Sequence, residues 1–219
     1  DLTWTKFHGV DLSGKIAVYS DFTRASFKNT NMENVDLSFS KLVQVDFAKI
    51  KNKSLAGAAL TGASLTHSNL SGVDMSDVIM NRVNFQKTDL SGQDFSVISN
   101  SFIHGTIFME ANLVDSNFQG LNMASEDTFT ETFKNKAHLK NLSAEEALKI
   151  LLEGKHDTVA NKLPIYGEVH GNDLAISFIL FNNFVGANLE NANFKDADLR
   201  FAGFYLADLT NADLSGADL

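Results

Sequence analysis

Few residue groupings in this sequence could do chemistry. The six histidines are scattered, and none belongs to an HExxH motif or to another close metal-ligand spacing. No nucleophile elbow, P-loop or dinucleotide-binding glycine motif occurs. One local cluster of ligand types exists, formed by His156, Asp157, Glu168 and His170. Because even this cluster lacks a recognised ligand spacing, we expect solvated side chains and predict a non-enzymatic protein with no catalytic residue, cofactor or metal.

Aspartate is the charged residue with a recurring position. It often stands directly before a large apolar residue, and asparagine takes the same position elsewhere. If the apolar residue faces inward, its neighbour faces outward, so stacked units would arrange these carboxylates in rows. Two interpretations stay open: a solvated sequence preference, or a surface of negative potential. The aspartates concerned are Asp11, Asp21, Asp36, Asp46, Asp74, Asp89, Asp94, Asp198, Asp208, Asp213 and Asp218.

The composition narrows the class of partner. The chain has 219 residues, a net charge of -9 and a sequence pI of about 5.0, which disfavours direct binding to nucleic acid or anionic lipid. It contains no cysteine, so disulfides and thiolate metal sites are excluded. No apolar run approaches the roughly 20 residues of a membrane span. Acidic character of this kind suits a basic protein partner or simply keeps the protein in solution.

A period of five residues organises the chain. From Phe184 to Leu219 a large apolar residue returns at every fifth position, whereas a helix repeats every 3.6 residues and a strand every 2. The same period runs more loosely through the first 124 residues, with slips of three residues at Ala48 to Ser54 and Ser96 to Ser101. We predict surface loops at both slips, because an insertion in a stacked repeat must leave the core spacing intact.

Each unit of five predicts one short side and one corner. Two apolar positions that lie two residues apart point the same way on an extended backbone, so both face inward. Serine and glycine often follow, as at Ser71-Gly72 and Ser91-Gly92, and these residues favour turns. Repeating one bend closes a coil, and coils then stack with backbone hydrogen bonds at roughly 4.8 Å spacing.

The A-[DN]-[LF]-x-x runs resemble the pentapeptide-repeat family. The resemblance implies an all-β solenoid, a right-handed quadrilateral parallel β-helix with four units per coil and about eight coils here. It covers roughly three quarters of the chain. The predicted structural core consists of Phe7, Phe27, Phe47, Leu60, Leu65, Phe85, Leu113, Phe118, Phe184, Leu189, Phe194, Leu199, Phe204, Leu209 and Leu214, with the small residues Ala187, Ala192 and Ala197.

One interruption divides the repeat, so we predict N-terminal coils over 1–124, a non-repeat insertion over 125–171 and C-terminal coils over 172–219, within one continuous domain. The repeat positions resume at Leu174 and Ile179. The segment SAEEALKILLEG has a serine cap, a capping box and a terminal glycine, which predict an amphipathic helix over 143–153. This helix either packs on the coil wall or binds a partner. The candidate partner-binding residues are Leu148, Lys149, Leu151, Leu152 and Tyr166.

Three functions are compatible with these features. The leading one is a protein-protein interaction scaffold that presents rigid faces and the insertion to a protein partner. The second follows from the resemblance: some members, the quinolone-resistance proteins, protect DNA gyrase by resembling DNA, so the acidic rows could mimic DNA towards a type II topoisomerase. This chain differs from them by its large interruption, and their C-terminal dimerising segment is not visible in it. The third is a targeting or substrate-binding module of a larger effector or enzyme.

The chain begins and stops within a repeat, at Asp1 and Leu219. We therefore expect a fragment of a longer polypeptide, whose open edges could pair end to end with another copy. No direct nucleic-acid binding and no membrane span are expected, and the cytoplasm is the working assignment of compartment.

Overall fold

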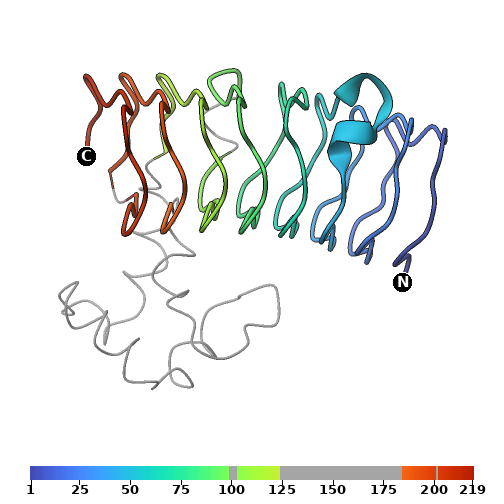
Figure 1. The fold of residues 1–219 in the computed structure, drawn as a ribbon. Helices are drawn as coiled ribbons and strands as arrows, with labels where there is room; N and C mark the ends of the chain where they lie inside the picture. Colours follow the sequence, from blue (N-terminus) through green and yellow to red (C-terminus); the bar gives the residue numbers. More distant parts are fainter. Residues whose placement is uncertain (99–102, 124–183, 201) are drawn as a thin grey trace, which may run out of the picture.

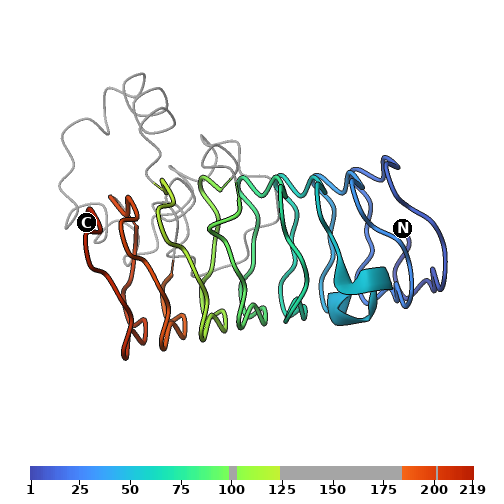
Figure 2. The same ribbon diagram turned by 90° about the horizontal axis from the view of Figure 1, so that it is seen from above.

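The computed structural model describes residues 1–98, 103–123, 184–200 and 202–219. These residues form one elongated stack of coils, with the two termini at opposite ends of the rod (Figures 1 and 2). Our predictions for the insertion, including the helix over 143–153 and the repeat positions Leu174 and Ile179, lie outside the described residues.

Parallel pairing between successive coils builds the stack. Leu65 donates its backbone N–H to Asn84 O at 2.8 Å, and Asn84 N–H donates in turn to Ala63 O at 2.9 Å. Every β-bridge between described residues is parallel, and most join residues 20 apart, such as Ser64 and Asn84. Four units of five therefore complete one coil. The fold is a right-handed quadrilateral β-helix, as the sequence predicts.

The bridge register gives eight coils. The separation rises from 20 to 23 residues at Asp36 and Ala59, which brackets the first slip, and again at Asn84 and Ile107, which brackets the second. It rises to 76 at Asn112 and Asn188, and returns to 20 afterwards. Insertions thus lengthen the path of one coil without shifting the stack. In coil 4 the four sides are centred on Leu65, Leu70, Met75 and Met80, and we call them sides one to four in that order.

A hydrogen-bonded turn forms most of the described corners. Val73 N–H donates to Leu70 O at 3.0 Å, and Gly72 between them has φ of 66°. Glycine adopts this left-handed conformation without cost, and asparagine and aspartate tolerate it better than other residues. At Gly57 the corner is also crowded, since a Cβ there would lie 2.3 Å from the Asn34 side-chain oxygen. The Ser-Gly pairs of the sequence are therefore corners.

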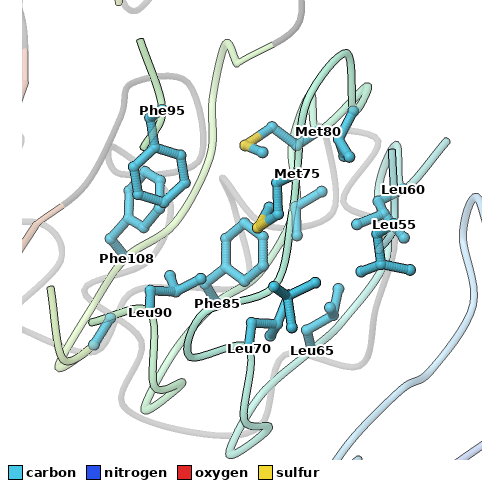
Figure 3. Packing of buried hydrophobic residues seen from close by; sticks show 14 of the residues in the cluster. Leu55, Leu60, Leu65, Leu70, Met75, Met80, Phe85, Leu90, Phe95 and Phe108 are labelled. Carbon is cyan, nitrogen blue, oxygen red and sulfur yellow. The ribbon is translucent and has the colours of Figure 1, made fainter. Parts of the chain in front are cut away.

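The core is a set of stacked side chains along the axis of the rod. Phe118 packs face to face with Phe95 at 4.5 Å and with Phe194 at 4.7 Å between ring centroids. Its edge meets the rings of Phe108 and Phe184 at 5.9 and 5.6 Å. Figure 3 shows the same layering of leucine, methionine and phenylalanine around Phe85.

Burial follows position in the stack. Fourteen of the predicted core residues are at most 1% exposed. They are Phe27, Phe47, Leu60, Leu65, Phe85, Leu113, Phe118, Phe184, Leu189, Phe194, Leu199, Ala187, Ala192 and Ala197. The other four, Phe7, Phe204, Leu209 and Leu214, are partly buried, because the first and last coils have a neighbour on one side only.

The first slip is more ordered than a simple outward loop. It forms two short 3-10 turns, η1 (Phe47–Lys49) and η2 (Lys51–Lys53), which stand out from the wall of the rod in Figure 2. Ile50 between them is 4% exposed and joins the core. Two bonds of 2.9 Å pin the loop to coil 2, from Asn29 N–H to Lys49 O and from Lys51 N–H to Thr30 O.

Candidate interaction surface

Sides two and three of coils 4–8 form one acidic surface, which we call the acidic side. It comprises residues 68–78, 88–98, 111–121, 187–197 and 207–217. It contains nine carboxylates and one lysine, Lys195, which gives a net charge of -8. The carboxylates are Asp74, Asp77, Asp89, Asp94, Asp115, Glu190, Asp196, Asp208 and Asp213.

Local hydrogen bonds hold many of these carboxylates in place. Asp74 accepts the backbone N–H of Ser76 at 3.0 Å, and Asp89 accepts that of Ser91 at 3.1 Å. The same bond recurs at most described repeats, with asparagine or serine as the acceptor where aspartate is absent, as at Asn69. An acceptor in this position closes an Asx-type turn. The preference for aspartate and asparagine before each core residue therefore has a structural cause.

These hydrogen bonds also favour the charged form of the carboxylates. The Thr210 hydroxyl donates to Asp208 at 2.6 Å, and this bond together with the Thr210 N–H lowers the pKa of Asp208. Hydrogen bonds from Ser215 lower the pKa of Asp213 in the same way. Asp208 and Asp213 thus stay ionised to lower pH than free aspartate would.

Asparagines separate some of the carboxylates that would otherwise stack directly, although Asp74 and Asp94 follow each other on side three. Asn112 donates from its amide to Asp89 at 3.0 Å, and Asn117 donates to Asp94 at 3.0 Å. Residues in such a column lie roughly 4.8 Å apart, so two neighbouring aspartates would repel each other. The amide satisfies the carboxylate and spaces the charges along the rod.

The resulting charge density resembles that of one DNA strand. Five coils span about 24 Å at the spacing of parallel strands, which gives one net charge per about 3 Å. One strand of B-DNA carries one phosphate per about 3.4 Å of its axis. A protein surface that binds a polyanion could therefore also bind the acidic side, because the spacing of charge is similar.

The structure does not test the residues that we predicted to bind a partner. Leu148, Lys149, Leu151, Leu152 and Tyr166 lie outside the described residues, as do His156, Asp157, Glu168 and His170. Within the described ranges, no group of three or more histidines and carboxylates is placed to hold a metal ion. Over the same ranges no helix is long and apolar enough to cross a membrane.

Sequence reasoning missed the division of the rod into charged sides. It recognised the outward aspartates, but it did not sort them by side, because the slips and the interruption change the separation between stacked residues from 20 to 23 or 76. A signal was present: Asp74 and Asp94 are 20 residues apart and share a side. Counting in twenties within each uninterrupted block would have revealed the acidic side.

A stack of four-sided coils with hydrogen-bonded corners defines this molecule as a solenoid repeat protein. A family model for pentapeptide repeats matches it in 8 copies, over residues 17–49, 54–96 and 183–219. These ranges cover just over half of the chain, and the chain belongs to the pentapeptide-repeat family. No curated protein sequence matches it significantly.

Several solved structures share the fold. A trypsin-treated variant of QnrB1, a plasmid-mediated fluoroquinolone resistance protein, is 14% identical with a TM-score of 0.57, over 98% of this chain and 86% of that one. A pentapeptide repeat protein from the Arabidopsis thaliana thylakoid lumen is 15% identical, with a TM-score of 0.34 and coverage of 68% and 77%. HetL from Nostoc sp. strain PCC 7120 is 19% identical, with a TM-score of 0.23 and coverage of 97% and 88%. At these identities the likeness concerns the fold alone.

Proposed function

We propose that the protein is a non-enzymatic interaction scaffold whose acidic side binds a basic surface of a protein partner. The observation that carries the proposal is the concentration of nine carboxylates against one lysine on two adjacent sides of five coils. Charged surfaces of one sign steer a partner of the opposite sign and raise the rate of association.

The rigidity of the scaffold supports this function. The carboxylates sit on a backbone that is bonded to the coil on either side, and several are held by hydrogen bonds of their own, as Asp94 is by Ser96 N–H at 3.0 Å. A preorganised surface loses little conformational freedom on binding, so more of the interaction energy becomes affinity.

Capture of a partner by matched variants tests the proposal. Asp77, Asp115 and Asp196 occupy corners with φ between 55° and 58°, where asparagine is well tolerated. The triple variant Asp77→Asn, Asp115→Asn and Asp196→Asn should fold normally and lose the partner that the native protein captures by crosslinking in cells. The matched control, Asp1→Asn, Asp21→Asn and Asp36→Asn, removes three charges from the other two sides and should retain it. Equal capture by both variants would refute the proposal.

A separate deletion distinguishes the insertion from the acidic side. The insertion over 125–171 with its predicted helix is the alternative binding element. If removal of 125–171 abolishes capture while the triple variant retains it, the partner binds the insertion. If the deletion leaves capture intact, Leu148, Lys149, Leu151, Leu152 and Tyr166 lose their proposed role.

A second candidate function is mimicry of DNA towards a type II topoisomerase, which the spacing of charge on the acidic side favours. QnrB1, which shares the fold, is described as a fluoroquinolone resistance protein. A gyrase supercoiling assay tests the candidate. Inhibition or drug protection at micromolar protein, lost in the triple variant and kept in its control, would support it. The absence of both effects would remove it.

A third candidate, a targeting or substrate-binding module of a larger effector or enzyme, depends on sequence beyond the present ends. The genomic sequence on either side would show a catalytic or membrane domain if this candidate is correct.

A further inference from the structure

A basic recess lies at the N-terminal end of the rod, on the coils that precede the acidic side. It spans coils 1–3 on side two and has a volume of ≈ 590 Å³. The lining includes His8, Lys28, Asn29, Lys49, Asn52 and Lys53, and none of its described lining residues is a carboxylate. In a chain of net charge -9 such a recess is unexpected.

The positive charge of the recess is largely uncompensated. Lys49 pairs with Asp46 at 2.6 Å, just outside the lining. Lys28 and Lys53 form no ion pair with any residue that the structure describes. At least two ammonium groups are therefore available to an anion.

The recess also has a defined shape and neutral hydrogen-bonding groups. The η1–η2 loop that forms one wall is anchored by the buried Ile50 and by its two bonds to coil 2. On the opposite wall, the His8 ring and the Ser26 hydroxyl are hydrogen-bonded at 2.8 Å. Asn29 and Asn52 supply amide groups at the rim. Ammonium and amide donors together match the acceptor oxygens of a phosphate group.

We propose that this recess binds a phosphate-bearing anion. Lys28 of coil 2 and Lys49 and Lys53 of the η1–η2 loop line it, and ammonium groups bind phosphate through charge-assisted hydrogen bonds. The site is independent of the acidic side, so either can be lost while the other functions.

Calorimetric titration of the full chain with inorganic pyrophosphate at low ionic strength tests the proposal. The native protein should bind, and Lys28→Gln with Lys53→Gln should weaken binding about tenfold for each lost charge. Lys195→Gln, which removes a lysine on the acidic side, should leave the affinity unchanged. Asp46→Asn should strengthen binding, because it releases Lys49 while the amide oxygen can still accept the Asn69 amide bond of 3.1 Å.

Three results would overturn the proposal: no binding of pyrophosphate at millimolar concentration, unchanged binding by the double lysine variant, or an equal loss in Lys195→Gln. Melting curves should show that all variants fold, since every substituted side chain is at the surface. Sedimentation with phosphatidylcholine vesicles, with and without phosphatidic acid, then identifies the source of the phosphate. Lysine-dependent binding to the acidic vesicles indicates a lipid headgroup, and pyrophosphate binding alone indicates a soluble ligand.

Discussion

The same two sides of the rod carry opposite charge at its two ends. On sides two and three, coils 1–3 hold six lysines against three carboxylates, whereas coils 4–8 hold one lysine against nine carboxylates. The backbone is alike in both parts, with the same parallel bridges and the same corners. The inward residues therefore determine the fold, and the outward residues are free to determine what each part of the surface binds.

The largest predicted effect is a loss of stability when a core phenylalanine of the acidic coils is removed. Phe118→Ala removes a fully buried ring that contacts four other phenylalanines. We expect a loss of about 3–5 kcal/mol in the free energy of unfolding, from lost burial and an unfilled cavity. Phe7→Ala in the partly buried first coil should cost clearly less. Denaturant unfolding followed by circular dichroism measures both, and equal losses would contradict the layered core.

A smaller change in stability should differ in sign between two buried serines, Ser68 and Ser116, which both occupy the small inward position of a unit. Ser68 Oγ donates to Leu42 O at 2.7 Å and accepts Val45 N–H at 2.9 Å. Ser116 Oγ is buried and has no hydrogen-bond partner among the residues that the structure describes. Ser68→Ala should lose about 1 kcal/mol, because it leaves backbone groups unpaired. Ser116→Ala should gain up to about 1 kcal/mol, and its column already continues with Ala192 and Ala212.

Thermal melting of the two serine variants against the native protein provides the measurement. The sign of the difference decides the outcome: a destabilised Ser116→Ala would mean that its hydroxyl contributes a bond to the fold.

The smallest effect concerns the acidic end at low pH. Because the folded pKa values of Asp208 and Asp213 lie below the ordinary value of 3.8, their ionisation stabilises the fold above that value. This contribution is lost as the pH falls through the lowered pKa values. Melting temperature should therefore fall below about pH 4. Asp208→Asn with Asp213→Asn keeps an acceptor that does not titrate, and should flatten this part of the profile; an unchanged profile would contradict the assignment.

Much of the fold could be predicted from the sequence because each period of five residues corresponds to one side and one corner of a coil. The centres Phe184 and Phe204 are four units apart, and the structure stacks their rings, whereas Phe194 on another side meets both rings edge to face. The corner glycines followed from the same period, and the count of about eight coils followed from the four units per coil that the family resemblance implies. Local repetition is enough to predict a fold in which each coil contacts only its neighbours.

The surface could be predicted only in part. Lys49 and Lys53 are close together in sequence, but their association with His8 and Lys28 depends on the loop folding back over coil 2. The burial of Ile50 within a slip was not predicted either, since the surrounding lysines indicate a solvated loop. The helix over 143–153 and the binding role of the insertion stay predictions.

The interruption between coils 6 and 7 has its two ends held side by side. Phe184 lies on Phe108 with 4.9 Å between ring centroids, and Asn122 is bridged to Asp198. Bringing the two ends of a loop together costs conformational entropy that grows with loop length. Here the stacking of coils 6 and 7 already holds the two ends in place. Removing 56 residues there would restore the ordinary separation of 20 from the present 76, so the corner after Met123 is a natural point for exchanging one inserted segment for another.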